Sequence, residues 1–296
     1  PHADLPRAAA GGLVLVFFGS DQGLLGSGSA FPGGLGELPR RSLRLTPQMA
    51  GGKKTAGGRF GSALCCADLD GDGSPEILVT NFSFEPVNLY RSVAPGFFLD
   101  DTFQLWLGEA TFPTLGFGLA VEDFDGDGDL DIAVANGHIL DDVSRIKDNV
   151  TFPQPNQVLV NRLTELNLKH SVGSWRPDRN LLTETTLAAG EAISRHRVSR
   201  GMAAGDFNGD GRPDLAVVNS NGPAELLRND TPDTANRLVL RVTGRKSDRD
   251  AGGTRLFVQP IDSETRWARE VRSASSYASQ HASDVYFGVG LSPAAR

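Results

Sequence analysis

The chain has 296 residues and a formal net charge of −7, with 36 Asp and Glu against 29 Lys and Arg. This acidic balance argues against nucleic acid as a partner, because nucleic-acid-binding domains carry a basic surface. The length suffices for one large domain and a small one. The sequence contains no apolar run long enough to cross a bilayer, so we expect no membrane span.

Residues 1–58 form an atypical N-terminal segment that is rich in glycine, proline and arginine and lacks acidic loops. Only Leu13 to Phe18 has the composition of a strand. A degenerate repeat unit, a linker and the remnant of a longer chain are three open explanations. The start at Pro1 rather than at methionine favours a fragment or a processed product.

Three copies of a nine-residue acidic loop follow: DLDGDGSPE from Asp68, DFDGDGDLD from Asp123 and DFNGDGRPD from Asp206. Each places side-chain oxygens at positions 1, 3, 5 and 9, a backbone carbonyl at position 7, and glycine at position 6. An all-oxygen cage suits calcium better than magnesium, because calcium takes about 6 to 8 oxygen ligands in a flexible geometry. We therefore expect three Ca²⁺ sites. The expected ligands are Asp68, Asp70, Asp72, Ser74 and Glu76 in the first loop, Asp123, Asp125, Asp127, Asp129 and Asp131 in the second, and Asp206, Asn208, Asp210, Arg212 and Asp214 in the third.

An EF-hand or a dockerin-like loop is the competing interpretation, and position 12 argues against both. Those loops close on an acidic residue there, whereas this chain has valine each time, at Val79, Val134 and Val217. The segments that follow, ILVTN, IAVAN and LAVVN, are short and rich in β-branched residues, as buried strands are. We therefore expect each cation to lie in a strand-loop-strand hairpin.

The loops belong to a longer repeat, in which each unit reads strand, acidic loop, strand, turn, strand. The loop starts, Asp68, Asp123 and Asp206, lie 55 and 83 residues apart, so the second unit carries an insertion. Repeats of this size with several strands each are typical of propeller blades, which need neighbours to bury their faces. The sequence therefore predicts an all-β fold.

The glycine-rich lead-in, the acidic loop and the hydrophobic strand resemble FG-GAP or VCBS repeats, the calcium-binding blades of integrin-alpha-like β-propellers. The stretches VANGHIL, QPNQVLVN and NSNGPAELLRND are more specifically similar to bacterial relatives of cartilage acidic protein, and NRLVLRVTGRKSDRDAGGTRLFV resembles their ASPIC/UnbV domain. The resemblance implies calcium-binding blades over residues 59–232 and a small antiparallel β domain over 236–296. It also implies a secreted or cell-surface protein, extracellular or periplasmic. Because only three loops occur, an incomplete ring is an open alternative.

A turn-forming stretch from Asn229 to Ala235 marks the boundary to the second domain. Beyond it we expect strands around Leu238 to Val242 and at Thr254 to Val258, Trp267 to Val271 and Val285 to Val289. Residues 237–272 contain nine Lys or Arg against five acids. This excess is consistent with an ordinary solvated surface, or with a weak patch for acidic glycans or a partner.

Two other residue types could suggest chemistry. Cys65 and Cys66 fall on a predicted strand, where two buried thiols are the main expectation and a strained vicinal disulfide is the alternative. His138 follows the second loop's strand and is expected to be a hydrogen-bonded turn residue, with a ligand role as the alternative.

Two functional classes remain. The first is a non-catalytic adhesion or binding scaffold, in which calcium stiffens the loops and these present a surface to an extracellular protein or glycan. The second is a propeller-based lyase or esterase, although no nucleophile-base motif occurs in the sequence. A titratable pair in a cleft away from the loops would favour the enzyme.

Overall fold

The computed structural model describes residues 63–162, 182–186, 188–232, 236–259, 266–272 and 276–290, together with two strands near the N-terminus. These are β1 (Val14–Phe17) and β2 (Ser42–Leu45), which pair antiparallel. β1 confirms the strand expected there, whereas β2 was not predicted. The rest of the expected 1–58 segment lies outside the described residues.

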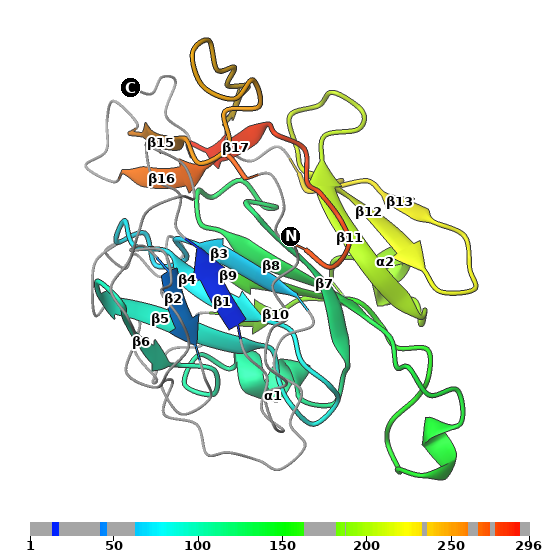
Figure 1. Cartoon of the computed structure of the whole chain (residues 1–296). Helices are drawn as coiled ribbons and strands as arrows, with labels where there is room; N and C mark the ends of the chain where they lie inside the picture. The colour runs from blue at the N-terminus through cyan, green and yellow to red at the C-terminus, as the bar shows by residue number, and fades with distance from the viewer. Residues whose placement is uncertain are drawn as a thin grey trace, which may run out of the picture.

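Three antiparallel sheets follow one another along the chain (Figure 1). The predicted unit of strand, loop, strand, turn and strand is present in each, and the first two sheets add a fourth strand that was not expected. The first sheet contains β3 (Leu64–Ala67), β4 (Glu76–Val79), β5 (Asn88–Ala94) and β6 (Phe97–Asp100). The second contains β7 (Gly116–Glu122), β8 (Asp131–Asn136), β9 (Gln157–Asn161) and β10 (Leu182–Glu184). The third contains β11 (Ser199–Gly205), β12 (Asp214–Asn219) and β13 (Glu225–Leu227).

Within the described residues, three short helical turns interrupt the strands, and none of them was predicted. They are α1 (Leu107–Thr111), the 3-10 helix η1 (Val143–Arg145) and α2 (Glu191–Ser194). The described structure is thus nearly all β, in successive antiparallel sheets. Closure of these sheets into a propeller ring remains a prediction.

The second sheet is buried on both faces because the three sheets stack face to face. Alternate residues of β7 point to opposite sides: Leu119 and Val121 pack against the first sheet, and Ala120 packs against the third. Two hydrophobic clusters fill the two inter-sheet spaces. Strand pleating explains this division, since successive side chains leave a strand on opposite faces.

The approach between β7 and β11 is unusually close, and glycine permits it. A methyl group built on Gly118 would lie 2.7 Å from the backbone nitrogen of Met202 and 2.9 Å from the carbonyl oxygen of Arg200. Both strands also have a register irregularity at this level, between Gly116 and Leu119 in β7 and between Ser199 and Met202 in β11. The two repeat units therefore share this backbone shape as well as their loops.

The C-terminal unit comprises two two-stranded antiparallel sheets. β14 (Arg237–Leu240) pairs with β17 (Val285–Gly288), and β15 (Arg255–Val258) pairs with β16 (Trp267–Glu270). One hydrophobic cluster joins the two sheets through Val258, Trp267, Val271, Val285, Phe287 and Val289. All four expected strands are confirmed within the described residues, each within a few residues of its predicted bounds.

Candidate metal centre

The three acidic loops share one backbone conformation, which aims the carboxylate at position 1 inward. In each loop the glycine at position 6 donates its N–H to that carboxylate: Gly73 to Asp68 over 3.0 Å, Gly128 to Asp123 over 3.1 Å, and Gly211 to Asp206 over 2.8 Å. Positions 4 and 6 both have positive φ, between 70° and 99°, which glycine adopts at low cost. The loops join β3 to β4, β7 to β8 and β11 to β12, which confirms the predicted hairpins.

The carboxylate at position 9 accepts hydrogen bonds from the same two backbone positions in all three units. Glu76 accepts backbone N–H groups from Leu69, at position 2 of its own loop, over 2.8 Å, and from Ser92, on the third strand of its unit, over 3.3 Å. Asp131 and Asp214 accept from the equivalent positions in their own units, over 2.7 to 3.0 Å. This carboxylate therefore ties the loop to the third strand in every unit.

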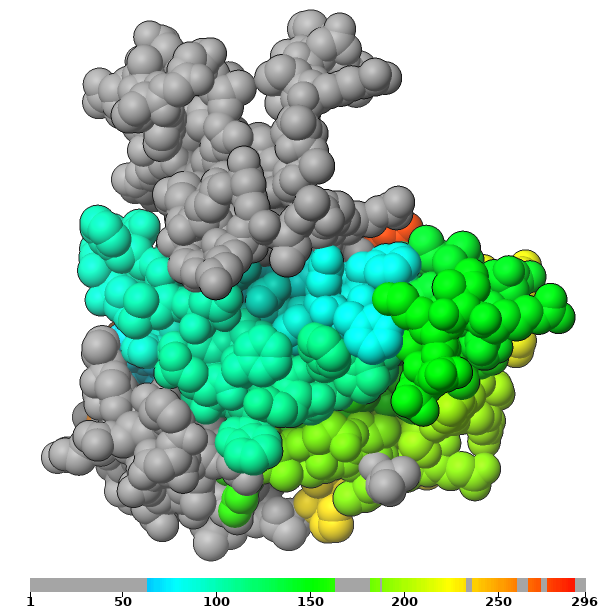
Figure 2. Space-filling view, turned by 90° about the horizontal axis from the view of Figure 1, so that it is seen from below, coloured from blue at the N-terminus to red at the C-terminus, as the bar shows by residue number. Residues whose placement is uncertain are grey.

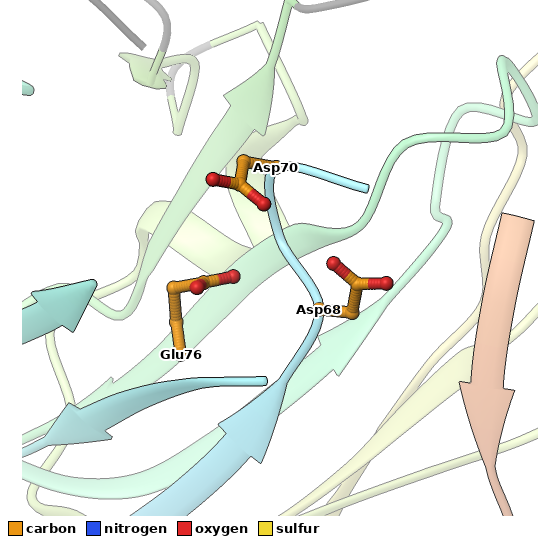
Figure 3. A group of neighbouring side chains, drawn as sticks. All are labelled: Asp68, Asp70 and Glu76. Carbon is orange, nitrogen blue, oxygen red and sulfur yellow. The ribbon is translucent and has the colours of Figure 1, made fainter. Parts of the chain in front are cut away.

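The first two loops each bring three carboxylates together. Oxygens of Asp68, Asp70 and Glu76 lie within 4.8 Å of one another, and Figure 3 shows their carboxylates facing one region, two from the loop and one from the start of β4. Asp68 Oδ1 and Asp70 Oδ2 are buried without a hydrogen-bond partner. Such orphaned acceptors are costly unless a donor or a cation satisfies them. The first loop therefore fits a hard cation.

The second loop repeats this grouping with Asp123, Asp125 and Asp131. The carboxylates expected at position 5, Asp72 and Asp127, lie outside the two groups; each accepts the N–H at position 7. The donor set still contains oxygen only, which is the chemistry that Ca²⁺ selects.

Burial perturbs the carboxylates of the first loop. It raises the pKa of Asp68 to about 6, and together with the charge of Asp72 it raises that of Asp70 to about 7. Burial and the charge of Asp70 raise the pKa of Glu76 to about 9. Charged carboxylates at such a site require compensation by a counter-ion.

The second loop shows the same electrostatics. Burial raises the pKa of Asp123 to about 6, and burial with the neighbouring charges of Asp129 and Asp125 raises that of Asp127 to about 9. The pKa of Asp131 also lies well above its usual value, first because of burial and then because of Asp125. Bringing a divalent cation to either loop would reverse these shifts, because it favours the ionised form.

The third loop has the same backbone but a different arrangement of side chains. Asp210 accepts hydrogen bonds from Arg212 Nη2 over 2.5 Å and from Asn208 Nδ2 over 2.8 Å. The backbone N–H of Arg212, which also donates to Asp210 over 2.9 Å, acts with these two bonds to hold the pKa of Asp210 below its usual value. Asp206, Asp210 and Asp214 do not form the kind of three-carboxylate group found in the other two loops.

The C-terminal unit covers the loop end of the stacked sheets. Arg255 donates to the carbonyl oxygen of Gly73 in the first loop, and Arg269 donates to that of Gly128 in the second over 2.6 Å. The N–H of Gly288 donates to Asp123 over 2.6 Å, and the indole of Trp267 packs against Gly128. Part of the basic excess of this unit therefore faces the acidic loops and is not an open surface patch. The expectation that the loops themselves present a binding surface is corrected accordingly for the first two loops.

The opposite end of the sheets exposes a group of large apolar side chains, which we call the aromatic face. Figure 2 views this end, where the segments around residues 82–86, 101–115 and 137–150 lie side by side. Phe84 stacks edge-on with Phe112 at 5.6 Å, and Lys147 lies 4.2 Å from the centre of the Phe84 ring, which joins the three segments. The face comprises Phe84, Phe103, Trp106, Phe112, Ile139, Leu140 and Ile146, all of which are exposed.

Two aromatic residues of this face have strained backbones. Phe84 has φ 64° and Trp106 has φ 67°, a left-handed conformation that is rare for bulky side chains. Such strain concentrates at ligand-contacting sites. Sequence reasoning missed the aromatic face, because the three segments that form it are separated along the chain and none has a motif.

The remaining candidates have structural roles. His138 is buried, accepts the N–H of Leu140 on Nδ1 over 3.1 Å, and lies 3.2 Å from Ser83 Oγ through Nε2. Its hydrogen bond with Leu140 agrees with the expected hydrogen-bonded turn residue. Burial lowers its pKa. Cys65 and Cys66 lie on β3 as thiols, and burial raises the pKa of Cys66 to about 12. Cys65 is buried and Cys66 is half-buried, so the expected free thiols are present in place of a disulfide, and burial by surface exposure is complete only for Cys65.

One polar pocket brings titratable groups together where the C-terminal unit meets the second sheet. Glu122, Arg272, His281 and Asp284 line it. Burial raises the pKa of Glu122 to about 7, although Arg272 and Arg269 oppose the shift. Glu122 directly precedes the candidate ligand Asp123, so this pocket adjoins the second loop and does not meet the criterion for an enzyme, which required a cleft away from the loops.

Comparison with known families agrees with the loop geometry. Residues 68–134 match the model of an FG-GAP-like repeat, and residues 200–235 match that of an FG-GAP repeat. These matches support an FG-GAP repeat protein, while the ASPIC/UnbV resemblance of residues 236–296 remains a prediction. A search of curated proteins returned no match. Within the described residues, no helix is long and apolar enough to cross a bilayer.

Proposed function

We propose that this protein is an extracellular Ca²⁺-binding scaffold, built from propeller blades, that binds a protein or glycan on its aromatic face without catalysing a reaction. The observation that carries the proposal is the contrast between its two ends. At one end, the loops that hold the buried carboxylates are covered by the C-terminal unit. At the other, exposed aromatic side chains, two of them on strained backbone, gather at one end of the sheets. Exposed apolar patches of this kind mark interaction sites.

Calcium would act as a structural ion. Asp68, Asp70 and Glu76 would hold one ion and Asp123, Asp125 and Asp131 a second, with Asp72 and Asp127 joining from position 5. A third ion would require Asp210 to exchange Arg212 for the cation, so we expect the third loop to bind most weakly. The bound ion supplies the positive charge that keeps these buried carboxylates ionised.

An extracellular setting fits the affinity expected of such loops. Extracellular calcium modules bind with dissociation constants of about 10⁻⁴ to 10⁻³ M. At a free calcium concentration ten times the dissociation constant, each site adds roughly 1.4 kcal/mol to stability. The FG-GAP matches favour the same location, since such repeats are typical of extracellular proteins.

The charges around the aromatic face indicate the chemistry of its partner. Glu109, Asp141, Asp142 and Asp148 are exposed there, and Arg145 and Lys147 only partly offset them. Aromatic rings take part in stacking and cation–π contacts, and they dominate the energetics of protein interfaces. We therefore expect a neutral or basic partner at this face and not an acidic glycan.

The test is binding to an array of glycans and extracellular matrix proteins, with calcium and with excess chelator. The variant Phe103→Ala removes an aromatic ring from the face, where 54% of the residue is exposed. Phe207→Ala is its matched control, because Phe207 is 53% exposed but lies in the third acidic loop. We expect binding that Phe103→Ala weakens and Phe207→Ala leaves unchanged. Equal effects of the two variants would refute the assignment of this face.

A further inference from the structure

We propose that two asparagine side chains, Asn161 and Asn229, couple the metal sites, so that a cation in one loop raises the affinity of the neighbouring loop. This inference rests on the proposed metal binding. Neither asparagine belongs to an acidic loop. Asn161 is the last residue of β9, Asn229 lies two residues beyond the end of β13, and each reaches the loop of the preceding unit.

Asn161 joins the first loop to the second. Its side-chain amide donates to the carbonyl oxygen of Leu69 over 2.8 Å and to that of Leu130 over 3.3 Å. Its backbone N–H donates to Asp131 Oδ1 over 2.9 Å. Asn161 is fully buried, so water cannot replace these bonds and their geometry is tightly held.

Asn229 repeats the connection between the second loop and the third. Its side-chain amide donates to the carbonyl oxygen of Phe124 over 2.8 Å and to that of Pro213 over 3.2 Å. Its backbone N–H donates to Asp214 Oδ1 over 2.7 Å. In the first unit the equivalent residue is Ser92, which has no side-chain amide. Within the described residues, the chain of asparagine contacts therefore begins at the first loop.

These bonds form one continuous path through the three loops. The residues at position 2, Leu69 and Phe124, connect its segments: the N–H of each donates to the position-9 carboxylate of its own loop, and its carbonyl oxygen accepts the side-chain amide of the asparagine from the next unit. The path runs through Glu76, Leu69, Asn161, Asp131, Phe124, Asn229 and Asp214.

The path supplies a physical route for coupling. A cation bound by Glu76 fixes the position of its carboxylate and of the Leu69 N–H that donates to it. The Leu69 carbonyl then has one preferred position, which orients Asn161 and, through its backbone N–H, Asp131. Because the first ion has already ordered Asn161 and Asp131, the second ion loses less conformational entropy on binding. The result is positive cooperativity without a large conformational change. Hydrogen bonds in a chain also strengthen one another in a low-dielectric interior.

The experiment is a coupling cycle on the first two loops. The third loop is disabled in every chain by Asp206→Asn and Asp210→Asn. The first loop is either intact or disabled by Asp68→Asn and Asp70→Asn, and each form is made with and without Asn161→Ala. Trp267 packs against Gly128, so its fluorescence follows Ca²⁺ binding in the second loop once Trp106→Phe and Trp175→Phe remove the other indoles.

With Asn161 present, disabling the first loop should weaken Ca²⁺ binding at the second loop by about fivefold or more. In the Asn161→Ala background, the same change should weaken it by less than about twofold. The matched control is Asn136→Ala. Asn136 is equally buried and its amide also makes two bonds, but both are to Pro155 and Gln157 in its own unit. This control should retain the coupling of the natural sequence.

Equal weakening in the two backgrounds, or no weakening with Asn161 present, overturns the inference. Absence of Ca²⁺ binding in the chain with both loops intact, measured by calorimetry, instead refutes the proposed function. Circular dichroism checks the folding of each chain. Should Asn161→Ala fail to fold, a second cycle decides, in which the first loop is disabled in every chain, the third loop is either intact or disabled, and each form is made with and without Asn229→Ala. Asn229 is only partly buried, so this variant should fold.

Discussion

At the scale of single residues, the position-9 carboxylate has two roles at once. Asp131 is fully buried and accepts two backbone N–H groups while it faces the other carboxylates of its loop. Charge and hydrogen-bond capacity can be separated at this position, because asparagine keeps the shape of aspartate but replaces one acceptor by a donor.

We predict that Asp131→Asn lowers the free energy of unfolding by about 2 kcal/mol even without calcium, because an amide NH₂ would face a backbone N–H in a buried site. Urea unfolding of the metal-free protein measures the loss. Asp230→Asn is the control, because Asp230 makes only an exposed ion pair with Arg228 and its loss should cost less than about 1 kcal/mol. A metal-free loss no greater than that of the control would show that Asp131 serves the cation alone.

At the scale of elements, the spacing between the second and third sheets depends on a glycine in the first strand of the second sheet. We predict that Gly118→Ala lowers the free energy of unfolding by about 1 to 3 kcal/mol, because its methyl group would meet the backbone of Met202 at 2.7 Å. The backbone of β11, which is paired with β12, cannot move aside as a flexible side chain can. Denaturant unfolding of the two proteins measures the difference.

Gly252→Ala is the control for that prediction. Gly252 has open space where the methyl group would lie, and its φ is not positive. We expect it to change the unfolding free energy by less than about 0.5 kcal/mol. A comparable effect of the two substitutions would contradict close packing between β7 and β11 as the cause.

The hairpins could be predicted from sequence because their determinants are local. The loop from Asp68 to Glu76 and the strand after it lie within a dozen residues, so residue type and spacing contain the signal. The partners of Asn161 could not be predicted in this way. Its amide meets Leu69, which is 92 positions away in the chain, and only the stacking of two sheets brings them together.

The docking of the C-terminal unit on the loops and the assembly of the aromatic face could not be predicted from the sequence for the same reason. The strands of the C-terminal unit follow from alternating apolar residues, but the contact of Arg269 with Gly128 depends on how that unit docks. Likewise, Phe84 and Phe112 meet because a turn and α1 share one end of the sheets. Periodicity reports which face of a strand is buried, and it carries no information about which distant segment covers that face.

At the scale of the whole molecule, we predict that removing calcium at neutral pH lowers the melting temperature by about 10 °C. Three sites at roughly 1.4 kcal/mol each give about 4 kcal/mol, and each kcal/mol corresponds to about 2 to 4 °C for a chain of this size. Differential scanning calorimetry with saturating calcium and with chelator measures the shift. Magnesium in place of calcium is the control and should restore little of it. An unchanged melt would remove the structural role of the ion.

The size of that calcium effect should grow with pH. Folding raises the pKa of Asp70 from 3.8 to about 7 and that of Glu76 from 4.5 to about 9. The metal-free folded state therefore binds more protons than the unfolded chain, so its stability is full below about pH 4 and is lost as the pH rises toward about 9. A bound cation keeps these carboxylates ionised and removes that dependence. Melting curves of dialysed and calcium-loaded protein should differ little at about pH 5 and most at about pH 8. A larger difference at the acidic end would show that these carboxylates are ionised without the ion.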